Sequence, residues 1–200
     1  EIERLLKQFA TLLRAIPAQV DTPIARLPLL EAEEQQRILR GFNDTAQTPP
    51  DYSFASELFA AQAARTPNAV AARHGTKALS YAELDKRANQ LAHTLVANGV
   101  GAGALVGVFL QRSLDMLACL HAIWRVGAAY VPIDPEYPVD RIAHMVEDSA
   151  ARLVITNDEL RSSLPDTCTV LLLDRETASI EAQPTAPPTA PAGDGAAPPT

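Results

Sequence analysis

The 200-residue sequence predicts an α/β fold: an incomplete doubly wound, mainly parallel sheet with helices on both faces, preceded by a helix and a linker. Short apolar runs alternate with amphipathic helical patterns from residue 53 to about residue 173, which is typical of β-α-β units with parallel strands. The apolar runs lack polar alternation, as expected when helices cover both faces of a sheet. Hydrophobic residues make up 47% of the chain and charged residues 20%, so there is enough apolar surface for a packed core.

The first 50 residues predict two helices and a linker ahead of this fold. Residues 1–16 place an apolar side chain at every third or fourth position, which predicts an amphipathic helix that ends at Pro17. These apolar residues are Ile2, Leu5, Leu6, Phe9, Leu12, Leu13 and Ile16. A short helix is expected at 31–40 with Gly41 as its C-cap, and residues 17–50 as a whole are interpreted as an interdomain linker.

Residues 51–182 carry the predicted α/β unit. We expect helices at 54–65, from the cap Ser80 to Gly99, from the cap Ser113 to Gly127 and at 138–148, and strands at 69–73, 105–110, 128–132, 152–156 and 169–173. Ser80 and Glu83 form a capping box, in which the serine hydroxyl accepts a hydrogen bond from a first-turn amide and the glutamate reaches back. The strand pattern ends after Asp174, and residues 183–200, rich in Pro, Ala and Thr, are expected to be a disordered tail.

Charge and composition exclude several classes of function. The net charge is −7, which argues against nucleic acid as a partner, because such binding needs clustered Lys and Arg. No apolar run approaches the ~18 residues of a membrane span. The two cysteines are not spaced as zinc ligands are, and we interpret them as reduced thiols. A cytoplasmic location is therefore expected. The first residue is not Met and lies within a helical pattern, so the chain is expected to be a piece of a longer one.

The segment 99–104 fits the pattern GxGxx(G/A) of dinucleotide-binding loops. Such a loop follows a strand and opens a helix, so that its amides point at the pyrophosphate. In this sequence the order is reversed, because the glycines follow a predicted helix and precede a predicted strand. Gly99 is therefore interpreted as a helix C-cap and the remainder as a return turn.

The remaining candidate groups favour structural roles. His93, His121 and His144 lie within helical patterns, without a nucleophile or carboxylate at a telling spacing, and Cys119 lies in an apolar helix. Asp134 and Glu136 flank a proline in a loop that leaves a strand, where α/β proteins place functional loops. We favour a rigid structural loop, with a paired-carboxylate site as the open alternative. No residue is therefore assigned as catalytic, cofactor-binding or metal-binding; Asp134, Glu136 and Arg112 are the first candidates should the chain itself be reactive.

Two stretches, 79–92 and 127–135, resemble the first two core motifs of the amino-acid adenylation domains of nonribosomal peptide synthetases. The first reads Leu-Ser-Tyr-Ala-Glu-Leu and continues with Arg-Ala-Asn-Gln-Leu-Ala, and the second reads Gly-Ala-Ala-Tyr-Val-Pro-Ile-Asp-Pro. Residues 111–116 resemble a family strand-to-helix junction, and residues 57–59 and 65–71 resemble the domain's opening. Residues 29–45 resemble the linker from a condensation domain, and residues 1–16 that domain's last helix. One departure is Arg125-Val126-Gly127, where the family usually has Lys-Ala-Gly, at a position interpreted as structural.

The resemblance implies a parent enzyme that activates an amino acid with ATP and Mg²⁺ to aminoacyl-AMP and loads it on a phosphopantetheine carrier, in secondary-metabolite biosynthesis. Its partners are then the upstream condensation domain, the rest of the adenylation domain, the carrier domain and the amino-acid substrate. The family's phosphate loop, ribose-binding acid and catalytic Lys are expected beyond residue 200, so this fragment alone is expected to bind no cofactor and to be inactive.

Two other functions remain open. One is the N-terminal part of an acyl- or aryl-acid-activating ligase of the same fold, which the condensation-type helix and linker disfavour. The other is a non-catalytic interaction module that uses the helix at residues 1–16 as a docking face.

Overall fold

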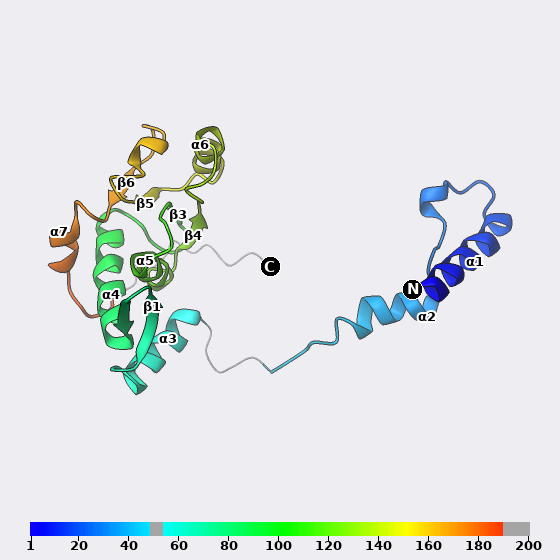
Figure 1. The fold of residues 1–200 in the computed structure, drawn as a ribbon, viewed down its shortest axis with the longest axis horizontal. Coiled ribbons are helices and arrows are strands. Elements are labelled where there is room, and N and C mark those ends of the chain that lie inside the picture. The colour runs from blue at the N-terminus through cyan, green and yellow to red at the C-terminus, as the bar shows by residue number, and fades with distance from the viewer. Residues whose placement is uncertain (49–53, 190–200) are drawn as a thin grey trace. The chain divides into compact units, whose positions relative to one another are not determined.

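The computed structural model describes residues 1–48 and 54–189, and the chain divides into two compact units, Glu1–Asp51 and Tyr52–Thr200 (Figure 1). Each unit is described by itself. No helix of the described ranges is long and apolar enough to cross a lipid bilayer.

The first unit contains the two expected helices, with differences at their ends. Its elements are α1 (Ile2–Ala18), η1 (Ile24–Arg26), α2 (Ala32–Gln36) and the π-helical turn η2 (Arg37–Gly41). Pro17 lies inside α1 rather than ending it, because a proline in the last turn removes only one helical hydrogen bond. Gly41 is the last residue of η2 and not its cap. The side chain of Asn43 caps this end instead, by donating to the carbonyls of Ile38 and Leu39 at 3.4 and 3.0 Å.

The second unit contains the predicted α/β fold. Its elements are α3 (Ala55–Arg65), β1 (Val70–His74), β2 (Lys77–Ser80), α4 (Tyr81–Ala97), β3 (Leu105–Val108), α5 (Leu114–Arg125), β4 (Ala129–Pro132), α6 (Val139–Asp148), β5 (Leu153–Thr156), η3 (Arg161–Ser163), β6 (Val170–Leu172) and α7 (Thr177–Glu181). Strands β4-β3-β5-β6 form one sheet in that order, and all neighbouring strands are parallel.

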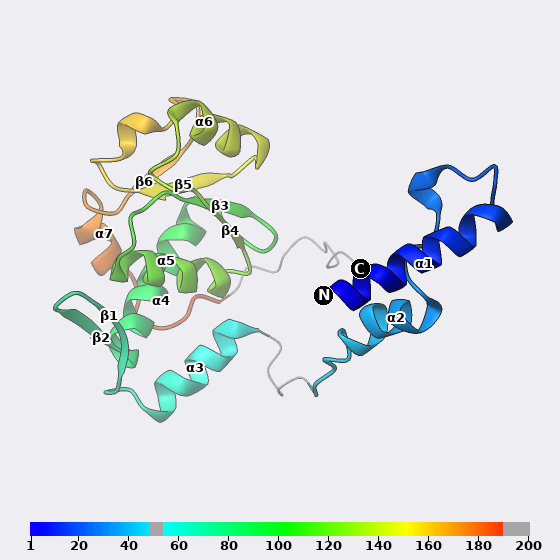
Figure 2. The same ribbon diagram turned by 45° about the vertical axis from the view of Figure 1, so that its right-hand side comes forward.

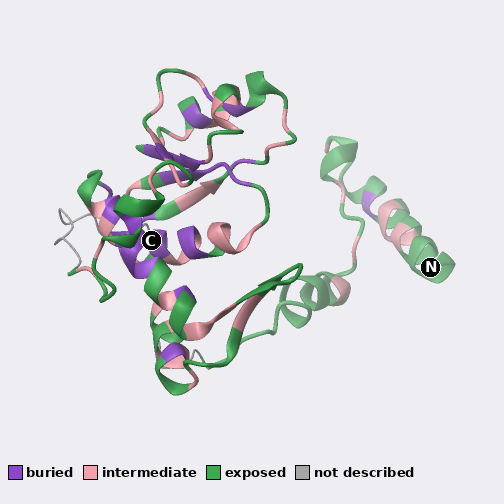
Figure 3. Ribbon diagram, turned by 60° about the vertical axis from the view of Figure 1, so that its left-hand side comes forward, coloured by how far each residue is buried: buried purple, intermediate pink, exposed green. Residues whose placement is uncertain are grey.

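Helices cover both faces of this sheet, which confirms the predicted fold class (Figure 2). Alternate strand residues point to opposite faces, so each face has its own core. One core joins α4, α5 and α7 to Val106, Val108, Leu153, Ile155 and Leu171. The other joins α6 to Phe109, Ile133 and Val154. The buried residues concentrate in the sheet and in the faces of α4 and α5 turned toward it (Figure 3).

The strand expected at 69–73 forms but lies outside the parallel sheet. It pairs antiparallel with β2 in a separate two-stranded hairpin. The sequence patterning did not predict β2. His74 pairs with Lys77, so the loop consists of Gly75 and Thr76, and the positive φ of 58° at Gly75 suits such a short connection. The short helix α7 was not predicted either.

Candidate functional site

The candidate site is the edge of the sheet where the parallel strands end. From β3 the chain passes through α5 to β4 on one side, and from β4 through α6 to β5 on the other side of β3. In open α/β sheets, ligands bind beyond the carboxyl ends of the strands at such a switch point. The loops after β3, β4, β5 and β6 therefore contain the groups to examine, among them exposed Arg112 after β3.

The loop after β4 holds the predicted pair Asp134 and Glu136, and both are exposed. Asp134 Oδ1 accepts a hydrogen bond from the Glu136 amide at 3.0 Å, and its carbonyl accepts from the Tyr137 amide at 3.1 Å. The guanidinium of Arg141 lies 4.2 Å from the centre of the Tyr137 ring. Asp134 thus closes the turn that leads into α6, which supports the structural interpretation of this loop.

The loops after β5 and β6 bind one another. Asp174 accepts hydrogen bonds from the amides of Asp158 and Arg175, each at 3.0 Å. The side chain of Arg175 forms an ion pair with Asp158 at 2.6 Å. Both carboxylates of this cluster are therefore engaged in joining the two loops.

The glycine segment 99–104 lies at the opposite, amino-terminal edge of the sheet, directly before β3. Gly99 has a φ of 76° and follows α4, as a helix C-cap does. Gly103 has a φ of 77°, and its amide donates to the carbonyl of Gly127 at 2.9 Å. These glycines shape a return turn, as interpreted from the sequence, and do not open a helix toward a phosphate.

The histidines and cysteines are held in structural contacts or exposed positions. The ring centres of His121 and Phe59 lie 4.1 Å apart. Burial lowers the pKa of His121, and the nearby charge of Arg125 lowers it further. His144 is exposed on α6. Burial raises the pKa of the Cys119 thiol to about 12, so this thiol stays protonated and unreactive. Across the described ranges 1–48 and 54–189, no three His, Cys, Asp or Glu side chains are placed to hold a metal ion.

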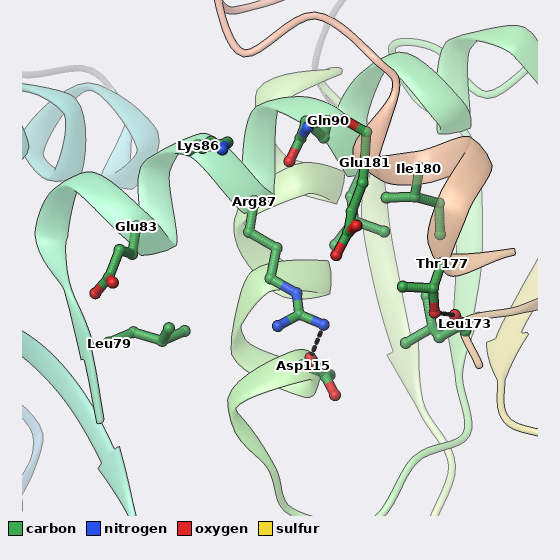
Figure 4. A pocket seen from close by; sticks show the side chains of 11 residues that line it. Leu79, Glu83, Lys86, Arg87, Gln90, Asp115, Leu173, Thr177, Ile180 and Glu181 are labelled. Atoms are coloured by element: carbon green, nitrogen blue, oxygen red, sulfur yellow. Dashed lines mark hydrogen bonds and ion pairs between the residues drawn. The ribbon is translucent and has the colours of Figure 1, made fainter. Parts of the chain in front are cut away.

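A hollow of about 450 Å³ lies between β2, α4, the start of α5 and α7 (Figure 4). Its lining residues are Leu79, Glu83, Lys86, Arg87, Gln90, Leu91, Asp115, Leu173, Thr177, Ile180 and Glu181. Arg87 and Asp115 form an ion pair across it at 2.5 Å. Because the lining charges are of both signs, the hollow favours neither an anion nor a cation, and it does not assemble a phosphate site.

The polar face of α4 holds the segment that follows α7. We call residues 182–189 the strap. Four contacts join α4 to the strap and the end of α7: Gln90 Nε2 to the carbonyls of Glu181 (2.6 Å) and Gln183 (3.3 Å), Asn89 Nδ2 to that of Thr185 (2.7 Å), and His93 Nε2 to that of Ala186 (3.0 Å). Three residues at the start of the expected disordered tail, Gln183, Thr185 and Ala186, thus contact a helix, and residues 190–200 lie outside the described residues.

Arg125 is part of this arrangement. Its guanidinium hydrogen-bonds to Asp85 and to Asn89 on α4, and its side chain is only 8% exposed. The sequence patterning missed these roles, although a signal was present. Asn89 and Gln90 are consecutive amides beside the apolar stripe of α4, and buried amides need partners.

Residues 59–199 match the sequence profile of the family described as AMP-binding enzyme. The chain belongs to this family. Among curated relatives of this chain, tyrocidine synthase 2 of Brevibacillus parabrevis is 46% identical over 175 residues, and tyrocidine synthase 3 of the same organism is 41% identical over 177 residues. Each alignment covers 88% of this chain, but the two cover only 5% and 3% of the respective relatives.

The fold of this chain is also similar to a solved structure of the nonribosomal peptide synthetase FmoA3 (S1046A) in its AMPPNP-bound form, with a TM-score of 0.69 and 32% identity. The likeness covers 94% of this chain and 20% of that one. The resemblance to synthetase adenylation domains is confirmed by these matches. The assignment of residues 1–16 to a condensation domain stays a prediction.

Proposed function

We propose that the chain is the N-terminal part of an amino-acid-activating adenylation domain in a nonribosomal peptide synthetase. In the proposed reaction, the amino-acid carboxylate attacks the α-phosphorus of ATP, and aminoacyl-AMP forms as pyrophosphate leaves. A phosphopantetheine thiol of a carrier domain then takes the acyl group and AMP leaves. A condensation domain upstream, a carrier domain downstream and a cytoplasmic location belong to the same proposal.

One observation favours a synthetase over a stand-alone acyl- or aryl-acid ligase. The match with tyrocidine synthase 2 spans 175 residues of this chain, which is more than the part from residue 59 onward can supply. The similarity to that synthase therefore extends into the first unit, ahead of the AMP-binding match. A ligase that begins with its own AMP-binding domain has no reason to share that segment.

Within this proposal the described residues supply scaffold rather than reacting groups. A triphosphate needs converging amide donors and cations. At the carboxyl edge, Asp134 closes its own turn, and Asp158 and Asp174 join two loops. The glycines at 99–103 lie at the other edge. The described residues thus do not fit ATP or its Mg²⁺, and we assign them no step of the reaction.

Amino-acid-dependent exchange of radiolabelled pyrophosphate into ATP tests this function. We expect no exchange by the 200-residue chain with any of the twenty amino acids, because loss of a single preorganised donor already costs about 10²–10³ in rate. A polypeptide that contains this chain and the residues that follow it in the reading frame is expected to show exchange with one or a few amino acids. Exchange by the short chain would contradict the scaffold role, and exchange by the longer one with aryl or fatty acids alone would contradict amino-acid activation.

A further inference from the structure

The contacts between α4 and the strap use side chains of α4 that are almost wholly buried. Asn89 is 1% exposed and Gln90 is 5% exposed. A buried amide that lacks a hydrogen-bond partner is unfavourable, so these two side chains favour the state in which the strap is bound. Their partners lie more than 90 residues away in the sequence, which makes the contact tertiary and not part of the helix itself.

Arg125 determines which way the Asn89 amide points. One guanidinium nitrogen donates to Asn89 Oδ1 and another donates to Asp85 Oδ1. Because the carbonyl side of the amide is occupied by a cationic donor, its NH₂ group turns outward, where it donates to the Thr185 carbonyl at 2.7 Å and lies 3.3 Å from Asp85 Oδ2. Charge-assisted hydrogen bonds in so buried a place are strong, and the planar fork of arginine suits two acceptors at once.

The partners on the strap are all main-chain carbonyls. These hydrogen bonds therefore depend on the path of the strap's backbone and not on the identity of its side chains. Prolines at 184, 187 and 188 fix φ near −65° and lower the entropy that the strap loses when it is held.

We propose that Arg125 is a positioning residue that, through Asn89, clamps the strap against α4 and so sets the direction in which the strap leaves the helix. Asp85 holds the guanidinium, the guanidinium orients the amide, and the amide holds the strap. The consequence for activity rests on the proposed function: in a synthetase, the strap leads toward the segment in which the resemblance places the phosphate loop.

Trypsin tests the clamp after a cleavage site is placed in the strap. Thr185 is exposed and meets α4 through its carbonyl, so Thr185→Arg creates a site before Ala186 without removing a contact. In this background we expect Arg125→Met to speed cleavage at residue 185 about tenfold or more, because proteolysis follows the population of the locally opened state. Cleavage at the other Lys and Arg residues should change less than about twofold.

Three further variants make the result specific. Asn89→Leu leaves the Asp85–Arg125 pair in place, so it should speed strap cleavage like Arg125→Met and covers the case in which that variant fails to fold. Arg125→Lys keeps the charge but loses the planar fork, so its strap cleavage should fall between the parent rate and that of Arg125→Met. Asp115→Asn breaks the other ion pair between α4 and α5, that of Arg87, and should leave strap cleavage unchanged. Unchanged strap cleavage in both clamp variants, or equal acceleration at every site, would overturn the proposal.

A second readout concerns activity and uses the longer polypeptide described above. We expect Arg125→Met to lower kcat for pyrophosphate exchange about tenfold while KM for the amino acid stays within about threefold, as for a group that orients reacting parts rather than binding substrate. Faster strap cleavage with unchanged kcat would overturn the link to activity. Lack of exchange by the parent polypeptide would count against the proposed function alone, because cleavage tests the clamp independently.

Discussion

His121 shows at the residue scale how packing sets the charge state of a side chain. Burial lowers its pKa first, Arg125 lowers it further, and Asp85 opposes this shift. Its ring lies against Phe59 of α3 and edge-on to Trp124 of α5, 5.5 Å away. Since the folded pKa lies below the unfolded value near 6.5, the unfolded state binds the proton more tightly. His121 therefore costs no stability above that pH and lowers stability as the pH falls below it.

We predict that His121→Phe removes part of this pH dependence. Phenylalanine keeps the ring contacts but cannot take up a proton. Between pH 7.5 and 5.5, the free energy of unfolding measured in urea should fall less in the variant than in the parent. The slope of this free energy against pH gives the difference in bound protons between the unfolded and folded states. His144→Phe, at an exposed position of α6, is the control for replacing a histidine outside this ring cluster. Equal slopes for His121→Phe and the parent would show that this ring does not titrate as the structure implies.

At the element scale, the capping box at the start of α4 is confirmed. Ser80 Oγ accepts from the Glu83 amide at 3.3 Å, and Glu83 Oε2 accepts from the Ser80 amide at 2.8 Å. These bonds lower the pKa of Glu83. We predict that Ser80→Ala destabilises the second unit by about 1 kcal/mol, the usual cost of a lost N-cap.

Urea or thermal unfolding of parent and variant measures this loss. Ser80→Thr retains a capping hydroxyl and should recover most of the stability. A fall in turnover of the longer polypeptide at unchanged stability would instead make Ser80 a residue of the active site.

Elements with a local signal were predictable from the sequence, and elements defined by distant partners were not. Ser80 and Ser113 cap α4 and α5 as expected, because a cap depends on residues three positions apart. Strand β2 has four residues and exists through its pairing with β1, so its pattern is too short to stand out. The alternation of strands and helices predicted parallel pairing, but β1 satisfies the same pattern and pairs elsewhere.

The turn at the carboxyl edge was easier to predict than the clamp around Asn89, because the clamp joins distant segments. The turn at Asp134 is local, and its structural role was favoured from the flanking prolines alone. The contacts of Asn89 with Arg125 and Thr185 depend on how α4, α5 and the strap meet in space. The sequence signal for them is the pair of consecutive amides, Asn89 and Gln90, beside the apolar stripe of α4.

At the scale of the whole molecule, the first unit carries an apolar face that its own described residues leave open. Six large side chains of α1 are between 45% and 74% exposed: Ile2, Leu5, Leu6, Phe9, Leu13 and Ile16. An amphipathic helix is stabilised mainly by burying such a face, and contiguous exposed apolar surface of this kind marks an interaction site. If residues 1–16 are the last helix of a preceding domain, that domain would cover the apolar face of α1.

We therefore predict that the 200-residue chain binds the dye ANS and self-associates through α1. The double variant Leu6→Gln, Phe9→Gln should lower ANS fluorescence at least about twofold and shift the chain toward monomer in size-exclusion chromatography with light scattering, because it interrupts the patch at its middle. Glu3→Gln, Lys7→Gln alters exposed charges on the same turns and should change neither readout. A parent chain that is monomeric and does not enhance ANS fluorescence would contradict this prediction. The apolar face of α1 would then be buried against its own chain, and no preceding domain would be needed to cover it.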